Sequence, residues 1–376
     1  MRIIFKALVF AFLIYGMTVT AQEIPFDTIL KKARSEIYNN PDNSIAIANN
    51  LLKKNKNVDQ TIQIYMLLST ANIAKRNFDE SLQYILKAKE LAQKSNNPKT
   101  QVRVLTTVAI QYQQMELFSK SFETLEEADI YLAKLPDSIP EKHIETARGY
   151  AIRGMIYKSQ SNSEIALKKF LKSIESFEKA GSKKDTYANI SVVYYNIGYC
   201  YLYLNQTDKA HEAFVQSIDY AKKNNAKSLE AFALKGMSEL YKQNRENQAA
   251  LNLLIKAENL CRETKDLILN EGIYKEMADN YLAMGKQDLY QKYNRKFFEM
   301  RFKRGQNELK SINHDINNHN SETLKKSEKI KTHYYWLKFF VICLGSIIII
   351  FLLYFILKTK KQNNKYQKEI QQMLRS

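Results

Sequence analysis

Large and small side chains follow a fixed order along most of the chain. In the segment YYNIGYCYLYLNQTDKAHEAFVQS, Tyr194 is followed by Gly198 and Tyr201, at offsets of four and seven residues. Residues at these offsets share one face of an α-helix. The order recurs six times at intervals of 40 to 45 residues, and its leading residues are Tyr65, Leu105, Tyr150, Tyr194, Leu234 and Tyr274. Four residues after each of them stands a small residue, namely Ser69, Ala109, Gly154, Gly198, Ser238 and Ala278.

A second helix is predicted in each copy. It begins its pattern with Ser81, Ser121, Ala166, Ala210, Ala250 and Tyr290. Four residues later come Ile85, Leu125, Phe170, Phe214, Leu254 and Asn294. Small residues on both helices let the two approach closely. Polar residues suited to a first helical turn stand two positions earlier, at Asp79, Ser119, Glu164, Asp208, Gln248 and Asp288.

This repeated pair of helices resembles the tetratricopeptide repeat (TPR) family over residues 62–298, with a degenerate further copy at 24–54. The resemblance implies an all-α superhelical solenoid of helix–turn–helix units whose inner groove binds peptides or proteins. The family unit has about 34 residues, so the longer spacing predicts longer second helices or longer connections between repeats. Tyr290, Asn294 and Phe297 replace the expected residues in the last copy, which predicts a cap.

The two ends of the chain carry targeting signals. Residues 1–21 combine Arg2 and Lys6 with an apolar stretch and a small-residue cleavage site, and they predict an export signal. An uncleaved N-terminal anchor is the alternative. Residues 339–357 are 19 residues without a charge, long enough at ~1.5 Å per residue to cross a bilayer. With Trp336 at the edge, we expect a transmembrane helix at 336–357.

These signals divide the chain. We expect a signal peptide at 1–21, a periplasmic repeat array at 22–298, a helical stalk at 299–335 and a basic cytoplasmic tail at 358–376. This is a single-pass topology in a bacterial inner membrane. In the stalk, the residues seven positions apart from Phe302 to Leu337 are mostly apolar. The second heptad position that a coiled coil needs is mostly not apolar, so a homodimer through a coiled coil stays open.

Composition supports helices and argues against nucleic acid. Among 376 residues there are only 10 Gly and 5 Pro, too few for the turns of an all-β fold. The net charge is +18, of which the signal carries +2 and the tail +5. The remaining +11 is thinly spread, so direct nucleic-acid binding is not expected. The basic tail is typical of an anchor beside anionic lipid.

Residues that could carry catalysis or bind a metal are few. No hydrolase, nucleotide-binding or zinc-protease motif occurs, so neither an enzyme nor a cofactor is expected. His314 and His319 are five residues apart, a poor spacing for a metal site on one helix face. Cys200 and Cys261 lie in different repeats, and free buried thiols are favoured over a disulfide.

The resemblance also implies which residues line the groove. The family geometry places groove residues one, five and eight positions after the leading residues Tyr150, Tyr194 and Leu234. Arg148, two positions before Tyr150, is added to them. The candidates are Arg148, Ala151, Met155, Lys158, Tyr195, Tyr199, Leu202, Lys235, Glu239 and Lys242. An aromatic centre flanked by basic residues suits an extended peptide with apolar anchors and some acidic residues. Alternatively, Lys235/Glu239 and Lys275/Asp279 are surface ion pairs at i,i+4. Some members of the family bind a C-terminal carboxylate through Lys and Asn residues of their first helices. Here Lys235 meets Glu239 instead, so a ligand of that kind is doubtful.

Two functions remain at this stage. The layout resembles bacterial envelope sensors, in which a periplasmic array signals through one membrane helix to a DNA-binding or kinase domain. Such a domain would follow Ser376 or belong to a separate partner. The alternative is a static scaffold that tethers a protein assembly in the envelope.

Overall fold

The computed structural model describes residues 25–95, 97–181, 184–262, 264 and 266–373, with side chains except at 307–308, 310–326, 366, 369 and 371–373. The predicted signal peptide, residues 1–21, lies outside the described residues. The chain divides into two compact units, Met1–Ser311 and Ile312–Ser376. Each is described by itself.

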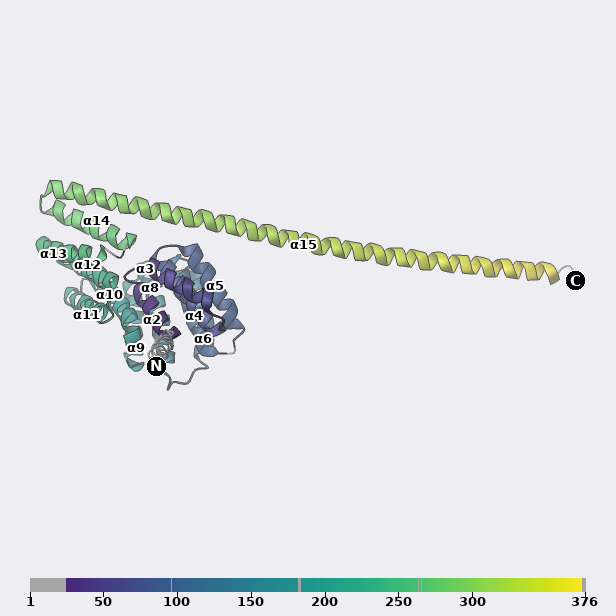
Figure 1. Cartoon of the computed structure of the whole chain (residues 1–376), viewed down its shortest axis with the longest axis horizontal. Coiled ribbons are helices and arrows are strands. Elements are labelled where there is room, and N and C mark those ends of the chain that lie inside the picture. Colours follow the sequence, from purple (N-terminus) through teal and green to yellow (C-terminus); the bar gives the residue numbers. More distant parts are fainter. Residues whose placement is uncertain (1–24, 96, 182–183, 263, 265, 374–376) are drawn as a thin grey trace, which may run out of the picture. The chain divides into compact units, whose positions relative to one another are not determined.

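The first unit is a succession of paired helices (Figure 1). The first helices of the pairs are α2 (Phe26–Glu36), α4 (Val58–Ala74), α6 (Pro98–Gln114), α8 (Pro140–Ser159), α10 (Tyr187–Tyr203), α12 (Lys227–Gln243) and α14 (Leu267–Ala283). The second helices are α3 (Pro41–Lys54), α5 (Phe78–Gln93), α7 (Phe118–Leu132), α9 (Ser163–Lys179), α11 (Thr207–Lys223), α13 (Asn247–Cys261) and α15 (Gln287–Met373). No strand occurs in the part of the chain that the structure describes. The predicted all-α repeat architecture is confirmed.

Helix lengths correct one detail of the prediction. The extra residues were expected in the second helices or in the connections between repeats. The first helices α4, α6, α10, α12 and α14 have 17 residues each and α8 has 20. The second helices α5 to α13 have 15 to 17. The first helices are therefore as long as the second ones and share the excess over a 34-residue unit.

One turn geometry joins the two helices of every pair from α4 onward. The middle residue of the turn has a positive φ in each case, at Arg76, Glu116, Ser161, Asn205, Arg245 and Gly285. The next residue donates its N–H to the carbonyl five positions back, as from Gln206 to Tyr201 at 2.9 Å. This Schellman closure ends the first helix and satisfies one of its terminal carbonyls. The second helix then starts where its polar first-turn residue was predicted.

Three buried glycines of the first helices face phenylalanine rings from the second helices. A Cβ built on Gly198 would lie 2.6 Å from the Phe214 ring, and one on Gly236 of the next repeat would lie closer still. Gly154 faces Phe170 in the same way, at 2.7 Å. Where the second helix carries Ile85, Leu125 or Leu254 instead, the small residue is serine or alanine. Glycine is therefore required where the partner is phenylalanine, because the ring fills the space of a side chain.

We expect Gly198→Ala to destabilise the protein by about 1–3 kcal/mol, because the methyl group overlaps the fully buried Phe214 ring. Urea unfolding of the full-length protein in detergent measures the change. Gly305→Ala is the matched control, since a Cβ there meets nothing within 4 Å, and it should raise stability by roughly 0.5–1 kcal/mol. Gly198→Ala should lower the free energy of unfolding by less when Phe214 is also replaced by leucine. An equal cost in both backgrounds would contradict the packing argument.

The turn after α2 contacts the start of α12, far along the chain. The Asn39 side chain donates to the Asn225 carbonyl at 3.1 Å and accepts the Lys227 N–H at 3.1 Å. The Tyr38 carbonyl accepts the Ser228 N–H at 3.2 Å. The N-cap residue of α12 is alanine and offers no side-chain acceptor. The first repeat therefore caps the sixth first helix, and we call this contact the clasp.

We expect Asn39→Ala to cost roughly 0.5–2 kcal/mol, the usual value of an N-cap. Amide exchange measured by mass spectrometry should rise in peptides covering 224–232. Asn39→Asp is the matched variant, because it keeps the acceptor for Lys227 and loses the donor to the Asn225 and Ser35 carbonyls. It should show a smaller effect. Unchanged exchange in Asn39→Ala would mean that the clasp is not formed in solution.

Both cysteines of the array are buried and free. Burial raises the pKa of the Cys200 thiol to about 11 and that of Cys261 to about 12. Because the thiolate is the reactive form, both thiols are chemically quiet at neutral pH. Of the two alternatives, the structure has free thiols.

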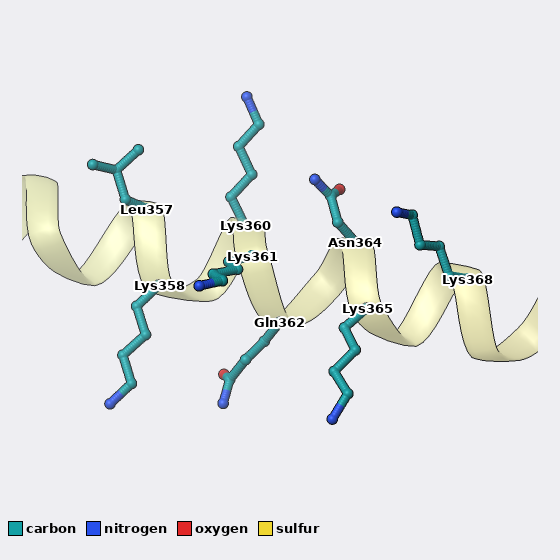
Figure 2. Close-up of a pocket in the computed structure, with 8 residues that line it drawn as sticks. All are labelled: Leu357, Lys358, Lys360, Lys361, Gln362, Asn364, Lys365 and Lys368. Atoms are coloured by element: carbon teal, nitrogen blue, oxygen red, sulfur yellow. The ribbon is translucent and has the colours of Figure 1, made fainter.

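The first part of α15 belongs to the last pair of the array. Lys296 forms an ion pair with Glu258 at 2.9 Å, and Arg304 forms one with Glu271 at 2.6 Å. In the second unit, Ser327–Lys365 is long and apolar enough to cross a membrane. Around the C-terminal end of this segment, lysines leave the helix on opposite sides. Figure 2 shows Lys358 and Lys365 on one side and Lys360 and Lys368 on the other. The space between these side chains is bounded by one helix and forms no enclosed pocket.

Candidate functional site

The predicted groove residues lie on three consecutive first helices. Arg148, Ala151, Met155 and Lys158 are on α8; Tyr195, Tyr199 and Leu202 are on α10; Lys235, Glu239 and Lys242 are on α12. The structure brings five of them into one cluster, which we call the aromatic–charge cluster: Lys158, Tyr195, Tyr199, Lys235 and Glu239.

Tyrosine rings form the apolar part of this cluster. The Tyr195 and Tyr199 rings meet edge to face at 5.0 Å, and both contact the Phe214 ring, at 6.4 and 5.4 Å. Tyr203, one further turn along α10, lies 5.8 Å from Tyr199 and is 59% exposed. Edge-to-face pairs of this kind stabilise an aromatic cluster beyond its buried area. The same Phe214 ring that requires Gly198 and Gly236 therefore supports the tyrosines.

Charged groups surround the tyrosines at hydrogen-bonding distance. The Tyr199 hydroxyl donates to Glu239 Oε1 at 2.6 Å and accepts from Lys235 Nζ at 3.2 Å. Lys235 also forms an ion pair with Glu239. On the other side, Lys158 Nζ donates to Asn196 Oδ1 at 2.5 Å and lies over the Tyr195 and Tyr199 rings at 5.7 and 5.4 Å. Charged and aromatic groups are thus interleaved.

Burial decides the protonation of these groups. It raises the pKa of Tyr199 well above 10, and the neighbouring Tyr195 and Glu239 raise it further. The phenol is therefore neutral and can donate to Glu239. Burial lowers the pKa of Lys158. For Lys235, burial opposes the charge, but Tyr195 and Glu239 outweigh it and raise its pKa.

Three predictions for the groove need correction or refinement. Leu202 is 1% exposed and packs in the core with Phe214, so it cannot line an open groove. Lys235 and Glu239 do form the i,i+4 ion pair that was considered, but at 17% and 20% side-chain exposure it is largely buried rather than on the surface. The third prediction was a Lys275/Asp279 ion pair. In the structure the Asp279 carboxylate lies 3.7 Å from Lys242 Nζ, and Lys242 forms its shorter ion pair with Glu276.

Two of the other three α8 candidates, Met155 and Arg148, make no hydrogen bond within the cluster. Met155 is half-buried and packs against two core clusters. Arg148 binds Glu145 through two hydrogen bonds, at 2.9 and 3.0 Å, and reaches Thr107 of α6 at 3.4 Å. Arg148 thus connects α8 to α6 instead of α10.

Sequence reasoning missed the residues that accompany Arg148. Gln63, Arg103 and Arg148 occupy the same position, two before the leading residue, in three consecutive repeats. Arg34 of α2 donates to Gln63 at 3.4 Å. The shared repeat position was a signal in the sequence, but only Arg148 was selected from it.

Two histidines of the array make local contacts. His143 contacts the Asp137 carbonyl at 2.8 Å, and His211 packs against Tyr241. No group of three His, Cys, Asp or Glu side chains that could hold a metal is found among the described residues. The side chains of His314 and His319 lie outside those described.

Comparisons with known proteins identify the fold. No family model and no curated protein matches the sequence. Among solved structures, NprR in complex with its cognate peptide NprX is 14% identical, with a TM-score of 0.51, covering 77% of this chain and 83% of NprR. A Rap protein complexed with Competence and Sporulation Factor is 13% identical, with a TM-score of 0.50 and coverages of 71% and 81%. The APC/C hetero-tetramer Cut9–Hcn1 gives 12% identity, a TM-score of 0.52 and coverages of 76% and 47%. The fold is that of TPR-repeat proteins.

We expect Glu239→Gln to lower stability by about 1–3 kcal/mol, because it leaves Lys235 largely buried without its anionic partner and weakens the bond from Tyr199. Urea unfolding measures this change. Glu175→Gln is the control: Glu175 pairs with Lys179 in an exposed i,i+4 pair, and its loss should have no measurable effect. Equal stability of wild type and Glu239→Gln would show that the cluster carries no net interaction energy.

Proposed function

We propose that this chain is a membrane-anchored TPR protein whose inner face binds a peptide or protein ligand at the aromatic–charge cluster. The observation that carries the proposal is the placement of Lys158, Tyr195, Tyr199 and the Lys235/Glu239 pair on α8, α10 and α12, three neighbouring first helices. Two proteins that share the fold, NprR and Rap, were solved with NprX and with Competence and Sporulation Factor.

The cluster suits a ligand with an apolar anchor next to an acidic residue. Tyr203 offers an exposed ring beside Tyr199. Lys158 is held by a neutral amide, Asn196, and by ring faces rather than by a carboxylate. A ligand carboxylate would give it a stronger, charge-assisted partner. Aromatic anchors with charged neighbours are typical of the residues that dominate binding energy at interfaces.

The topology is part of the proposal. Residues 1–21 direct export and 22–298 form a periplasmic array. Residues 299–335 are a stalk, 336–357 cross the inner membrane, and 358–376 form a cytoplasmic tail. Ligand binding on the array then changes the position or pairing of α15, which continues without a break from Gln287 to Met373. A signal would pass inward along this helix.

A photo-cross-linking residue in place of Tyr203 should form an adduct with the ligand, because its ring is exposed beside the cluster. We expect the adduct yield to fall in a Lys158→Gln background, since this change keeps a polar partner for Asn196 but removes the charge. Mass spectrometry of adducts from membranes of the native host measures both.

The matched control carries the same group at Leu171, an exposed position on second helix α9. Adducts of equal yield and identity at Tyr203 and Leu171 would contradict binding at the cluster.

The alternative function is a static scaffold that tethers an envelope assembly. The exposed apolar residues Phe302, Leu309 and Ile330 on α15 favour contact with another helix, as a scaffold or a dimeric sensor would need. The two functions differ in one expectation. Replacing 336–376 with an unrelated anchor leaves a scaffold working and silences a sensor.

A further inference from the structure

Three arginines gather on the inner side of α2, α6 and α8, away from the aromatic–charge cluster. Arg148 reaches the Thr107 hydroxyl at 3.4 Å, and Thr107 lies one turn after Arg103 on the same face of α6. The Arg148 guanidinium therefore lies over the face of α6 that carries Arg103. Arg34 comes from α2 and reaches Gln63, which holds the position of Arg103 in the preceding repeat. We call these residues the arginine site.

The carboxylates near the arginine site are already engaged. Glu145 is 6% exposed and gives both oxygens to Arg148. Glu141 forms an ion pair with Lys99 at 2.7 Å. The Arg103 carbonyl accepts the Thr107 hydroxyl at 2.9 Å, but the Arg103 guanidinium makes no hydrogen bond or ion pair with any residue that the structure describes. The site therefore holds more positive than negative charge.

Desolvation and repulsion make this excess unfavourable in the free protein. Burial lowers the pKa of Arg103, although Glu145 opposes this effect, and Arg148 lowers it again by repulsion. Burial lowers the pKa of Arg34 as well, followed by repulsion from Arg103 and Arg148, while Asp185 and Asp27 oppose the shift. Partly desolvated cations whose carboxylate neighbours do not outweigh burial and repulsion raise the free energy of the folded state. A bound anion would remove this cost.

We propose that Arg34, Arg103 and Arg148 bind an oxyanion, a carboxylate or phosphate group that accepts paired hydrogen bonds from guanidinium. Arginine presents a planar fork of donors that matches such groups, which a single lysine does not. The site deepens the proposed function: if the array binds a peptide, this is where an acidic or phosphorylated part of it lies. Anion binding itself does not depend on that function.

The test uses the full-length protein in detergent with malonate and inorganic phosphate as probes, against chloride at equal ionic strength. We expect a saturable rise in melting temperature with one or both oxyanions, because a ligand that binds only the folded state stabilises it. Arg103→Gln should weaken binding roughly tenfold or more, the effect of losing a charged hydrogen-bond donor. A response to malonate alone assigns the site to carboxylates, and a response to phosphate alone assigns it to phosphate.

Stability without any probe gives a second readout. Arg103→Gln should be at least as stable as wild type, because it relieves repulsion and breaks no hydrogen bond or ion pair among the described residues. Arg148→Gln should be less stable, because it leaves the buried Glu145 without its partner. The control Arg262→Gln changes an exposed arginine that bonds only Asn259 in the described part of the chain, and it should leave anion binding unchanged.

Three results would overturn the proposal. The first is a melting temperature that rises no more with malonate or phosphate than with chloride. The second is an equal rise in wild type and in Arg103→Gln. The third is a loss of stability in Arg103→Gln as large as that in Arg148→Gln. None of them bears on cross-linking at Tyr203, which lies on α10 in the other cluster. Failure of the arginine site and failure of the proposed function are therefore distinguishable.

Discussion

The Phe214 ring lies in the space that side chains at Gly198 and Gly236 would fill, and much of the array depends on this contact. It holds α11 against the first helix of its own repeat and that of the next one. The same ring supports the edges of Tyr195 and Tyr199. Close packing transmits displacement, since the interior has little free volume. One side chain therefore contacts both the tyrosines of the aromatic–charge cluster and the two glycines that let α10, α11 and α12 approach closely.

The inner face has two regions with different electrostatics. In the aromatic–charge cluster, Glu239 compensates Lys235 and the phenols stay neutral, so the surface is apolar with fixed charges. At the arginine site, Glu145 and Glu141 attract the Arg103 guanidinium from a distance, but no carboxylate among the described residues bonds it, and three guanidinium groups lie near one another. A ligand that spanned both regions would need an apolar part and an anionic part in a fixed order. Such an order provides specificity, because reversing the ligand would leave its anion unpaired.

Most of the fold could be predicted because it is periodic. The six in-phase copies located every helix pair from α4 onward, and polar residues such as Asp208 marked the start of the second helices. The periodicity of one sequence describes neighbours along a helix, not the distance to the next helix. The family positions that the resemblance implies placed Leu202 in the groove, although close packing around Phe214 buries it. Periodicity also missed that Lys242 pairs with Glu276 of the following repeat. The boundaries of the membrane topology stay predictions.

The clasp connects repeats that are distant in sequence, which a linear stack of repeats does not do. Stacked repeats usually behave as a one-dimensional chain in which each unit senses only its neighbours, so unfolding can begin at an end and spread. Here Asn39 and Tyr38 bond residues 225–228, which joins the first repeat to the sixth. The intervening repeats become a closed loop, and fraying of α2 also removes the cap of α12. Local opening at the N-terminal end is thereby coupled to the sixth repeat, so these repeats should melt as one cooperative unit.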